Sequence, residues 1–226
     1  MGFRFVRYLV RVILALIARV EIIGLENLPA QGAYLATGNH AGRLEVLLIY
    51  SIIERTDIIL MIAEKYRKSA IWRWFARRVD GIFIDRYNAD LSALRQVLRR
   101  LEQGGVLAMA PEGTRSTTGT LQPAQPGAAY LAAKSGVPVV PVGVIGTWDQ
   151  EVVQNLKKLK RIKVTLRIGQ AYSLPPLKNQ DRQSQLQQYT EEIMCQIAAL
   201  LPAERRGYYA EHPRLFEILK TNNNST

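Results

Sequence analysis

Apolar and polar positions follow two different patterns along this chain. The first twenty residues place apolar side chains around most of a helix, with arginines at intervals of three and four. Beyond Gly24 and Pro29, short unbroken apolar runs alternate with longer stretches of helical spacing. Unbroken apolar runs are typical of strands covered on both faces, and strands that alternate with helices are typical of α/β domains. The pattern predicts a single α/β domain with a mixed β-sheet flanked by helices, preceded by an N-terminal amphipathic helix.

The predicted elements divide the chain into three parts. Strands are expected at Ala33–Thr37, Ile58–Ala63, Gly81–Ile84, Val106–Ala110, Val137–Ile145 and Ile162–Ile168. Helices are expected at Glu45–Ile53, Lys65–Arg78, Asp90–Gln103, Gln125–Ser135 and Arg182–Leu200. The parts are an amphipathic helix at residues 1–24, the α/β domain at 25–201 and a C-terminal tail at 202–226. We expect the tail to drape over the domain or to remain mobile, and residues 222–226 to be disordered.

The amino-terminal segment, Phe3–Val20, carries a basic stripe beside a wide apolar surface. At ~100° per residue, Arg4, Arg7 and Arg11 share one helical face. The longest uncharged apolar run, Val12–Ala18, is far shorter than the ~20 residues that cross a bilayer. Arginines interrupt the apolar stretch and no small-residue cleavage site follows, so it does not resemble a secretory signal. Two interpretations stay open: an in-plane helix on an anionic membrane surface, or a helix packed on the domain.

Composition and charge narrow the classes of protein. Of the 226 residues, 48% are hydrophobic and 22% are charged, which is globular composition and fits neither a disordered nor a collagen-like chain. The formal net charge of +11 favours an anionic partner: nucleic acid, an anionic membrane surface or a phosphorylated substrate. No RNA-recognition, zinc-finger or KH signature appears, so we expect no nucleic-acid partner. The single Cys195 excludes an internal disulfide, favours a reducing compartment and leaves no zinc-ligand cluster.

A second candidate surface combines aromatic and basic residues. Trp72, Trp74 and Phe75 lie in the sequence among Lys65, Arg67, Lys68, Arg73, Arg77 and Arg78. Tryptophans favour the headgroup zone of a membrane, and each basic residue near an anionic leaflet contributes ~1 kcal/mol. This cluster is therefore a candidate for a second membrane contact, with an ordinary solvated face over core aromatics as the alternative.

His40 follows a predicted buried strand and precedes a predicted helix, and ligand clefts in α/β sheets lie at such strand ends. Glu45 comes five positions later. With the histidine in the turn and the glutamate in the first helical turn, the carboxylate can hold one ring nitrogen while the other accepts a hydroxyl proton. Such a dyad suits attack by a substrate hydroxyl on an acyl group. Taken alone, the spacing is better explained by a hydrogen-bonded turn histidine, so other motifs must decide.

Two further predicted strands end in basic residues. Val106–Ala110 runs into Pro111–Ser116, whose sequence PEGTRS presents backbone amides and the Arg115 guanidinium to a cleft. The strand at Gly81–Ile84 is followed by Asp85 and Arg86. Because the planar fork of arginine matches phosphate geometry, these two arginines are candidates to hold one phosphate group.

Taken together, these residues resemble the glycerolipid acyltransferase family, most closely the 1-acyl-glycerol-3-phosphate acyltransferases of PlsC type. Four blocks appear in family order: Asn39-His40 with Glu45 resembles the NHxxxxD block, Gly81–Arg86 the second block, Pro111–Ser116 the PEGTRS core of the third, and Val137–Val142 the fourth. They cover roughly residues 30–146. The chain departs from the pattern twice, because Glu45 replaces the usual Asp and Gly42 stands where a hydroxyl residue is common.

The resemblance implies a role for each matched residue. His40 would be the general base and Glu45 its charge partner. Substrate binding would fall to Asn39, Lys65, Arg86, Glu112, Gly113, Thr114, Arg115 and Pro141. Within that set, Arg115 and Arg86 would hold the acceptor phosphate, and Pro141 would help to form the acyl or acceptor pocket. The family uses no metal and no bound cofactor, because an acyl-CoA or acyl-carrier-protein thioester is the donor.

The resemblance also implies a reaction and a location. We expect acyl transfer to the free hydroxyl of 1-acyl-glycerol-3-phosphate, which gives phosphatidic acid in phospholipid biosynthesis. The protein would be peripheral or monotopic on the cytoplasmic face of the bacterial inner membrane, with a lysophospholipid acceptor, an acyl-CoA or acyl-carrier-protein donor and an anionic membrane surface as partners. Alternatives are acylation of another lysolipid or lipid acceptor, and a membrane-binding pseudoenzyme suggested by Glu45.

Overall fold

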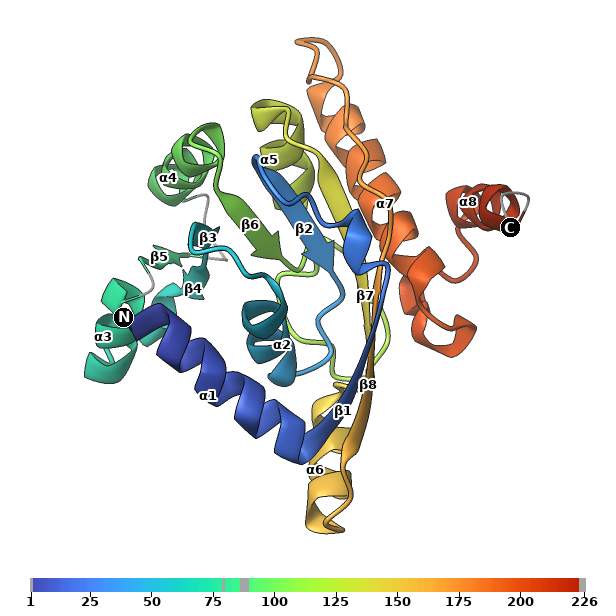
Figure 1. Ribbon diagram of the computed structural model, residues 1–226. Helices are drawn as coiled ribbons and strands as arrows, with labels where there is room; N and C mark the ends of the chain where they lie inside the picture. The colour runs from blue at the N-terminus through green and yellow to red at the C-terminus, as the bar shows by residue number, and fades with distance from the viewer. Residues whose placement is uncertain (1, 79, 86–89, 224–226) are drawn as a thin grey trace.

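A mixed sheet forms the centre of the computed structural model, which describes residues 2–78, 80–85 and 90–223 (Figure 1). Its strands are β1 (Ala18–Ile23), β2 (Tyr34–Gly38), β3 (Ile58–Ile59), β6 (Val106–Met109), β7 (Val139–Ile145) and β8 (Ile162–Ile168), in the order β1-β8-β7-β2-β6-β3. Neighbouring strands run parallel, except that β7 and β8 are antiparallel. The short strands β4 (Met61–Ala63) and β5 (Ile82–Ile84) form a separate parallel pair. The predicted α/β class and the mixed sheet are confirmed.

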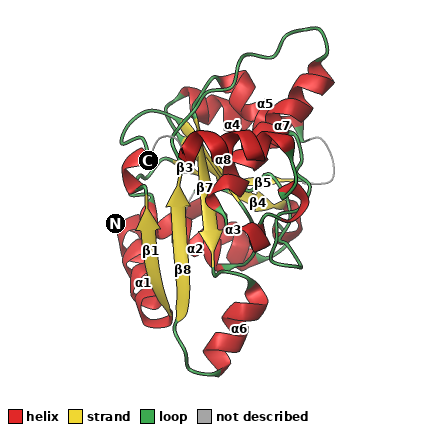
Figure 2. Cartoon of the chain, turned by 90° about the vertical axis from the view of Figure 1, so that its right-hand side faces the viewer, coloured by secondary structure: helices red, strands yellow, loops and turns green. Residues whose placement is uncertain are grey.

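Helices cover both faces of the sheet (Figures 1 and 2). On one face lie α1 (Gly2–Ile17) and α2 (Leu44–Ile52); on the other lie α4 (Leu91–Glu102), α5 (Gly127–Ser135), α7 (Arg182–Leu200) and α8 (Pro213–Asn223). The remaining helices are α3 (Ala70–Arg78) and α6 (Asp149–Lys157), and short 3₁₀ turns occur at Leu25–Asn27, Glu64–Tyr66, Ala203–Arg205 and Gly207–Tyr209. Helix α6 connects β7 to β8. Because β7 runs parallel to β2, α6 begins at the edge of the sheet at which β2 also ends.

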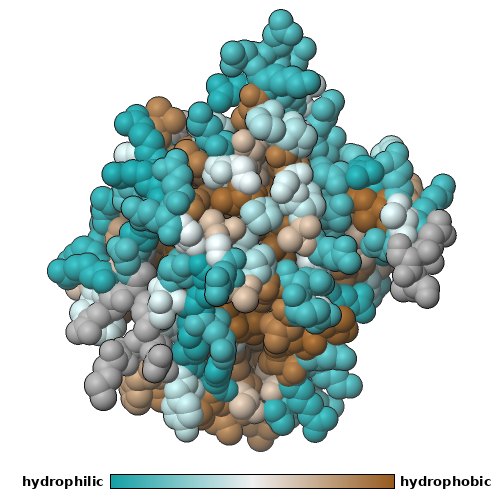
Figure 3. Space-filling view, turned by 45° about the horizontal axis from the view of Figure 1, so that its top comes forward, coloured by the Kyte–Doolittle hydropathy of each residue, from teal (hydrophilic) through white to brown (hydrophobic). Residues whose placement is uncertain are grey.

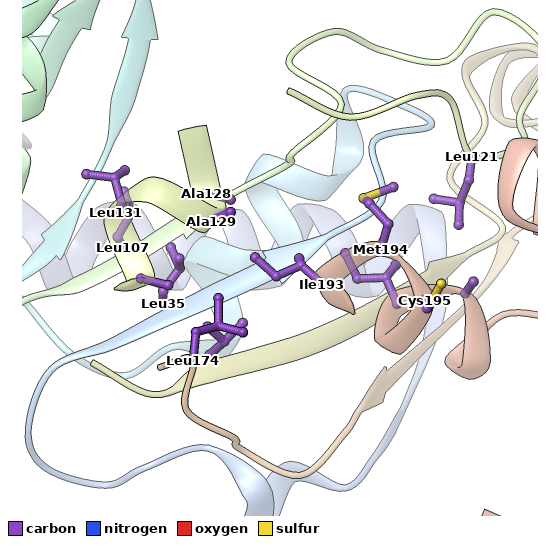
Figure 4. Packing of buried hydrophobic residues seen from close by; sticks show 14 of the residues in the cluster. Leu35, Leu107, Leu121, Ala128, Ala129, Leu131, Leu174, Ile193, Met194 and Cys195 are labelled. Atoms are coloured by element: carbon purple, nitrogen blue, oxygen red, sulfur yellow. The ribbon is translucent and has the colours of Figure 1, made fainter. Parts of the chain in front are cut away.

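Alternation along the central strands divides the core into two clusters. Tyr34 and Ala36 of β2 pack with α1 and α2, whereas Leu35 between them packs with α5 and α7. Figure 4 shows the second cluster, in which Met194 and Cys195 of α7 lie near the sheet. Because burial raises the pKa of the Cys195 thiol to about 12, this side chain is a neutral member of the core. Both faces of β2 are therefore fixed by packing.

The predicted amphipathic helix at 1–24 is wrong in its second part. The helix ends at Ile17, and Ala18–Ile23 forms β1, which pairs with β8 in parallel register. The sequence ARVEII alternates charged and β-branched residues, which suits a strand on the edge of a sheet. The predicted strand Ile58–Ala63 is likewise divided at Leu60 between two sheets.

The C-terminal tail folds onto the domain instead of remaining mobile. Leu215 and Ile218 of α8 are buried in the same cluster as α7. The segment expected to be disordered begins inside this helix, because α8 continues to Asn223, and residues 224–226 lie outside the described residues. The predicted bounds of α7 agree with the structure at both ends.

Arg7 and Arg11 of the predicted basic stripe face the protein, which for these two side chains favours the interpretation of a helix packed on the domain. Arg7 is 8% exposed and donates to the backbone carbonyl oxygens of Tyr50, Glu54 and Arg55 near the end of α2. Arg11 donates to the Ser51 carbonyl oxygen and the Glu54 carboxylate. Carbonyl groups at a helix C-terminus lack intrahelical partners and favour cations. The two arginines therefore fasten α1 to α2.

Fastening α1 through its arginines leaves large apolar side chains of the helix in solvent. Among the side chains of α1 that the structure describes, the large exposed apolar ones are those of Phe5, Tyr8, Leu9, Val12, Ile13 and Leu16. No helix in the part of the chain that the structure describes combines the length and the hydropathy needed to cross a bilayer. Figure 3 shows, for one face of the molecule, that apolar surface gathers in its lower part and polar surface dominates its upper part.

Candidate active site

The turn that carries His40 leaves the central strand β2 and enters α2. Asn39 holds this turn to β7, because its side-chain amide donates to the Val144 carbonyl oxygen at 2.8 Å and accepts from the Val144 N–H at 2.7 Å. These bonds continue the pairing of β2 with β7 beyond Gly38. Asn39 also lines the cavity described below, so the substrate contact predicted for it stays a prediction beside this structural role.

His40 and Glu45 form the predicted pair. The Nδ1 atom of His40 lies 2.6 Å from Oε2 of Glu45, and the two side chains are 19% and 3% exposed. Oε1 of Glu45 accepts three hydrogen bonds, from the backbone N–H groups of Ala41 and Gly42 at 2.8 Å and from the Thr147 hydroxyl at 2.7 Å. Because an ionised carboxylate only accepts, His40 donates through Nδ1 and leaves Nε2 able to accept a proton.

The PEGTRS turn fixes the backbone of His40 from two directions. Glu112 is 4% exposed, and its carboxylate accepts the His40 N–H and the Gln122 N–H, both at 2.8 Å. The Ser116 N–H donates to the His40 carbonyl oxygen at 2.7 Å. Burial raises the pKa of the Glu112 carboxyl to about 7, although the two backbone N–H groups act in the opposite direction. Glu112 thus contacts the His40 turn directly, and its predicted contact with substrate stays a prediction.

Arg115 extends from the same turn toward α6. Its guanidinium donates to Oδ2 of Asp149 at 2.9 Å, and the two side chains are 35% and 31% exposed. Oδ1 of Asp149 accepts the N–H of Arg43 at 2.9 Å, and the Arg43 guanidinium lies 3.7 Å from the same carboxylate. Asp149 therefore connects the predicted phosphate-binding arginine to the His40 turn.

A cavity of about 300 Å³ opens beside the dyad, between α2 and the sheet, and both His40 and Glu45 line it. Most of its other lining is aliphatic and includes Val46, Ile49, Ile53, Val142, Leu166 and Ile168. An apolar cavity with a few polar groups at one end is typical of a site that binds a largely apolar ligand. The arrangement places a proton acceptor at the end of a space suited to a hydrocarbon chain.

The structure brings some of the predicted binding residues together and separates others. Gly113, with a φ of 70°, lines the cavity, whereas Thr114 beside it is exposed. Lys65 is exposed, its ammonium lies over the Tyr66 ring, and it is not among the residues that line the cavity. Arg86 lies outside the described residues.

Pro141 lies on the face of β7 opposite to the residues that line this cavity, so the pocket contact predicted for it stays a prediction. Its ring is next to Gly169, while Val142 and Val144 line the cavity. The reason is the alternation of side chains along a strand.

Thr147 and Asp149 are site residues that the sequence reasoning did not identify. Both follow β7, which runs parallel to β2, so the two strands end at the same edge of the sheet. Polar residues directly after a strand parallel to β2 were the available signal.

Across the described ranges 2–78, 80–85 and 90–223, no group of His, Cys, Asp and Glu side chains is arranged to hold a metal ion.

Comparisons with known proteins place these features in a family context. The family model named Acyltransferase matches residues 19–145. A chloroplastic 1-acyl-sn-glycerol-3-phosphate acyltransferase, BAT2 of Brassica napus, is 30% identical over 57% of this chain and 38% of its own length. The 1-acyl-sn-glycerol-3-phosphate acyltransferase of Bacillus subtilis is 24% identical over 71% of this chain and 79% of its own.

A solved structure is also similar. The crystal structure of the 1-acyl-sn-glycerophosphate (LPA) acyltransferase PlsC from Thermotoga maritima aligns with a TM-score of 0.65 and 25% identity, covering 84% of this chain and 76% of that one. The chain spans about half the length of several curated relatives that it matches.

Proposed function

The chain belongs to the Acyltransferase family, and from this premise we propose that it transfers an acyl group from a thioester to the free hydroxyl of 1-acyl-glycerol-3-phosphate, forming phosphatidic acid. The observation that carries the proposal is the position of the His40–Glu45 dyad in the lining of an apolar cavity, with Arg115 in the neighbouring PEGTRS turn that is hydrogen-bonded to His40. The names of the relatives from Brassica napus and Bacillus subtilis support the choice of acceptor.

In the proposed reaction, His40 acts as the general base. Its Nε2 accepts the proton of the acceptor hydroxyl while the hydroxyl oxygen attacks the thioester carbonyl carbon. Glu45 holds Nδ1 and stabilises the imidazolium that forms. The C–S bond then breaks, and the thiol leaves with the proton that His40 returns. Proton transfer of this kind contributes ~10²–10⁴ in rate, and fixed orientation of the two substrates adds to it.

The substrates are assigned to the site by their chemistry. A hydrocarbon chain fits the aliphatic lining of the cavity, and the acceptor phosphate fits Arg115. Arg86, predicted as the second phosphate ligand, lies outside the described residues. The donor is proposed to be acyl-CoA or acyl-carrier protein, and the reaction written above requires no resident metal or cofactor.

The test of this function measures acyl transfer from acyl-CoA and from acyl-carrier protein, in parallel, to a panel of lysophospholipids. We expect conversion of lysophosphatidate to phosphatidate, reduced ~10²–10⁴-fold by His40→Ala. Transfer only to a different acceptor would overturn the assigned substrate and keep the dyad chemistry. Absence of any transfer by folded protein bound to vesicles would favour a pseudoenzyme.

We further propose that the exposed apolar face of α1 attaches the protein to an anionic membrane surface, in the bacterial inner membrane at its cytoplasmic face. Phe5, Tyr8 and Leu16 are 62%, 64% and 70% exposed, and such a face favours the boundary between headgroups and acyl chains. A second contact is proposed at α3, where Ile71 and Trp74 are 77% and 55% exposed beside basic side chains. The net charge of +11 favours anionic lipid.

Vesicle cosedimentation tests the attachment with two matched substitutions. Leu16→Glu places a charge on the exposed face of α1, and Leu91→Glu places one at the start of α4, where Leu91 is 58% exposed on the opposite side of the sheet. We expect Leu16→Glu to weaken binding to phosphatidylglycerol-containing vesicles and Leu91→Glu to leave it unchanged. Equal binding by both variants would contradict attachment through α1.

A further inference from the structure

The segment at residues 146–149, which comprises the loop between β7 and α6 and the first residue of α6, contacts the carboxylate of the dyad. The Thr147 side chain is 1% exposed and donates its hydroxyl to Oε1 of Glu45 at 2.7 Å. The other two donors to this oxygen are backbone N–H groups of the His40 turn. Thr147 is thus a side chain from a distant part of the sequence that determines where the Glu45 carboxylate points. With Oε1 held by three donors, Oε2 is directed at His40.

The same segment contacts the arginine that is assigned to the acceptor phosphate. Oδ2 of Asp149 accepts from Arg115 at 2.9 Å, and Oδ1 accepts from the backbone N–H of Arg43 at 2.9 Å. A guanidinium has five N–H donors, so one bond to Asp149 leaves others for a phosphate. Because one oxygen of Asp149 is fixed by the His40 turn, the other holds Arg115 at a set distance from that turn.

Close packing fixes the loop against the His40 turn. A Cβ atom on Gly42 would lie 1.8 Å from the Thr147 carbonyl oxygen, so the two backbones are in direct contact. Gly146 has a φ of 87°, and a Cβ on it would lie 2.0 Å from the Lys163 carbonyl oxygen of β8. The loop is therefore held between β8 on one side and the His40 turn on the other.

We propose that Thr147 and Asp149 are positioning residues that act on different halves of one site. Thr147 fixes the Glu45 carboxylate so that His40 presents Nε2 to the hydroxyl, and Asp149 fixes Arg115 for the acceptor phosphate. The proposal rests on the proposed function and names two residues that set its geometry. Glu45 and Gly42, the two positions at which the chain departs from the family pattern, both contact this loop.

Steady-state kinetics separate the two roles. Thr147→Val removes the hydroxyl and keeps the shape, so we expect kcat to fall about 10-fold while KM for lysophosphatidate stays within about twofold. Thr147→Ser keeps the hydroxyl and should restore kcat. Asp149→Asn keeps an oxygen for the Arg43 N–H and removes the charge that holds Arg115. For this variant we expect KM for lysophosphatidate to rise about 10-fold with little change in kcat.

Each half of the proposal has an outcome that overturns it. Equal kcat values for Thr147→Val and Thr147→Ser would remove the role of the hydroxyl. A lower KM in Asp149→Asn would mean that the carboxylate competes with the acceptor phosphate instead of positioning Arg115. A lower kcat and a higher KM in both variants, accompanied by a lower thermal unfolding midpoint, would mean that the loop has only a structural role.

A spectroscopic measurement keeps the dyad half independent of the proposed reaction. The Nδ1 proton of His40, which lies in a 2.6 Å hydrogen bond to Glu45, should give a downfield proton resonance, assigned by its absence in His40→Ala. We expect Thr147→Val to shift or broaden this resonance and Thr147→Ser to preserve it. An unchanged resonance in Thr147→Val would overturn the positioning role. The result is obtained whether or not the protein acylates lysophosphatidate, so the two failures are distinguishable.

Discussion

Two ion pairs lie at the His40 turn, and they differ in how far their side chains are buried. In the His40–Glu45 pair the side chains are 19% and 3% exposed, whereas in the Arg115–Asp149 pair they are 35% and 31% exposed. A buried carboxylate is tolerated when its oxygens are satisfied, and Glu45 has four donors. A pair that is about a third exposed contributes only ~0–1 kcal/mol to stability, and its one hydrogen bond leaves other N–H donors of Arg115 open to a ligand. The fixed geometry of the first pair suits the proton transfer proposed for His40, and the accessibility of the second suits the phosphate binding proposed for Arg115.

The largest test of this comparison changes the dyad carboxylate. In Glu45→Gln, the amide oxygen takes the place of Oε1 and accepts from the two backbone N–H groups and the Thr147 hydroxyl. The NH₂ group of the amide then faces His40. Nδ1 must then accept, so Nε2 carries the proton and cannot act as a base. We expect kcat to fall ~10³-fold, as for a triad histidine held in the wrong tautomer.

Glu45→Asp is the matched control, because it keeps the charge and shortens the side chain by one methylene. We expect a kcat loss of about 10-fold, from the poorer reach to His40 and Thr147. Both variants are compared by kcat with lysophosphatidate and by circular dichroism. Equal effects of Glu45→Gln and Glu45→Asp would count against the role of Glu45 as the charge partner.

The next effect concerns the pH dependence of stability and involves Glu112. This residue is buried like Glu45 but accepts from the backbone N–H groups of His40 and Gln122. Burial raises the pKa of this carboxyl from 4.5 to about 7, so the folded state binds the proton more tightly than the unfolded state. The stability that this proton provides is complete below pH 4.5 and is lost as the pH rises through about 7. The loss amounts to about 3 kcal/mol.

Urea unfolding of the protein and of Glu112→Gln, at several pH values between about 4.5 and 8, isolates this contribution. We expect the free energy of unfolding of the protein, relative to that of the variant, to decrease across this range. A difference that does not change with pH would mean that the Glu112 carboxyl titrates at its ordinary pKa, and that its two N–H donors fully offset its burial.

The fold was predictable where the signal is local. The bounds of α7 agree with its helical pattern, and the central strands agree with unbroken apolar runs. The strand β1 was not predictable in this way, because it continues directly from a helix and gains its identity by pairing with β8, far along the chain. The arginines of α1 have the same spacing whether they face headgroups or the carbonyl oxygens of α2, so periodicity could not place them.

The candidate site likewise divides into contacts that the local sequence predicts and contacts between distant parts of the chain. The His40–Glu45 contact spans five positions and the motif around Arg115 is contiguous, so the local sequence made both of them candidates, and the combination of motifs favoured the dyad over a turn histidine. Thr147 lies 102 positions from Glu45, and Asp149 lies 106 from Arg43. Such contacts depend on strand order, which places the ends of β2 and β7 together. The face of β7 on which Pro141 lies could not be predicted for a related reason, since the motif names a strand and not the face to which each residue points.

The smallest expected effect belongs to the exposed pair. Arg115→Ala should raise KM for lysophosphatidate about 10-fold and change kcat by no more than about twofold, because a contact made equally in the ground and transition states affects binding alone. KM for 1-acyl-glycerol, which lacks the phosphate, should not change. Because Arg115 and Asp149 are about a third exposed, the thermal unfolding midpoint should change little. Unchanged lysophosphatidate kinetics would remove the phosphate contact, whereas a loss confined to kcat would show that Arg115 acts on the dyad and that the two pairs are not separate in function.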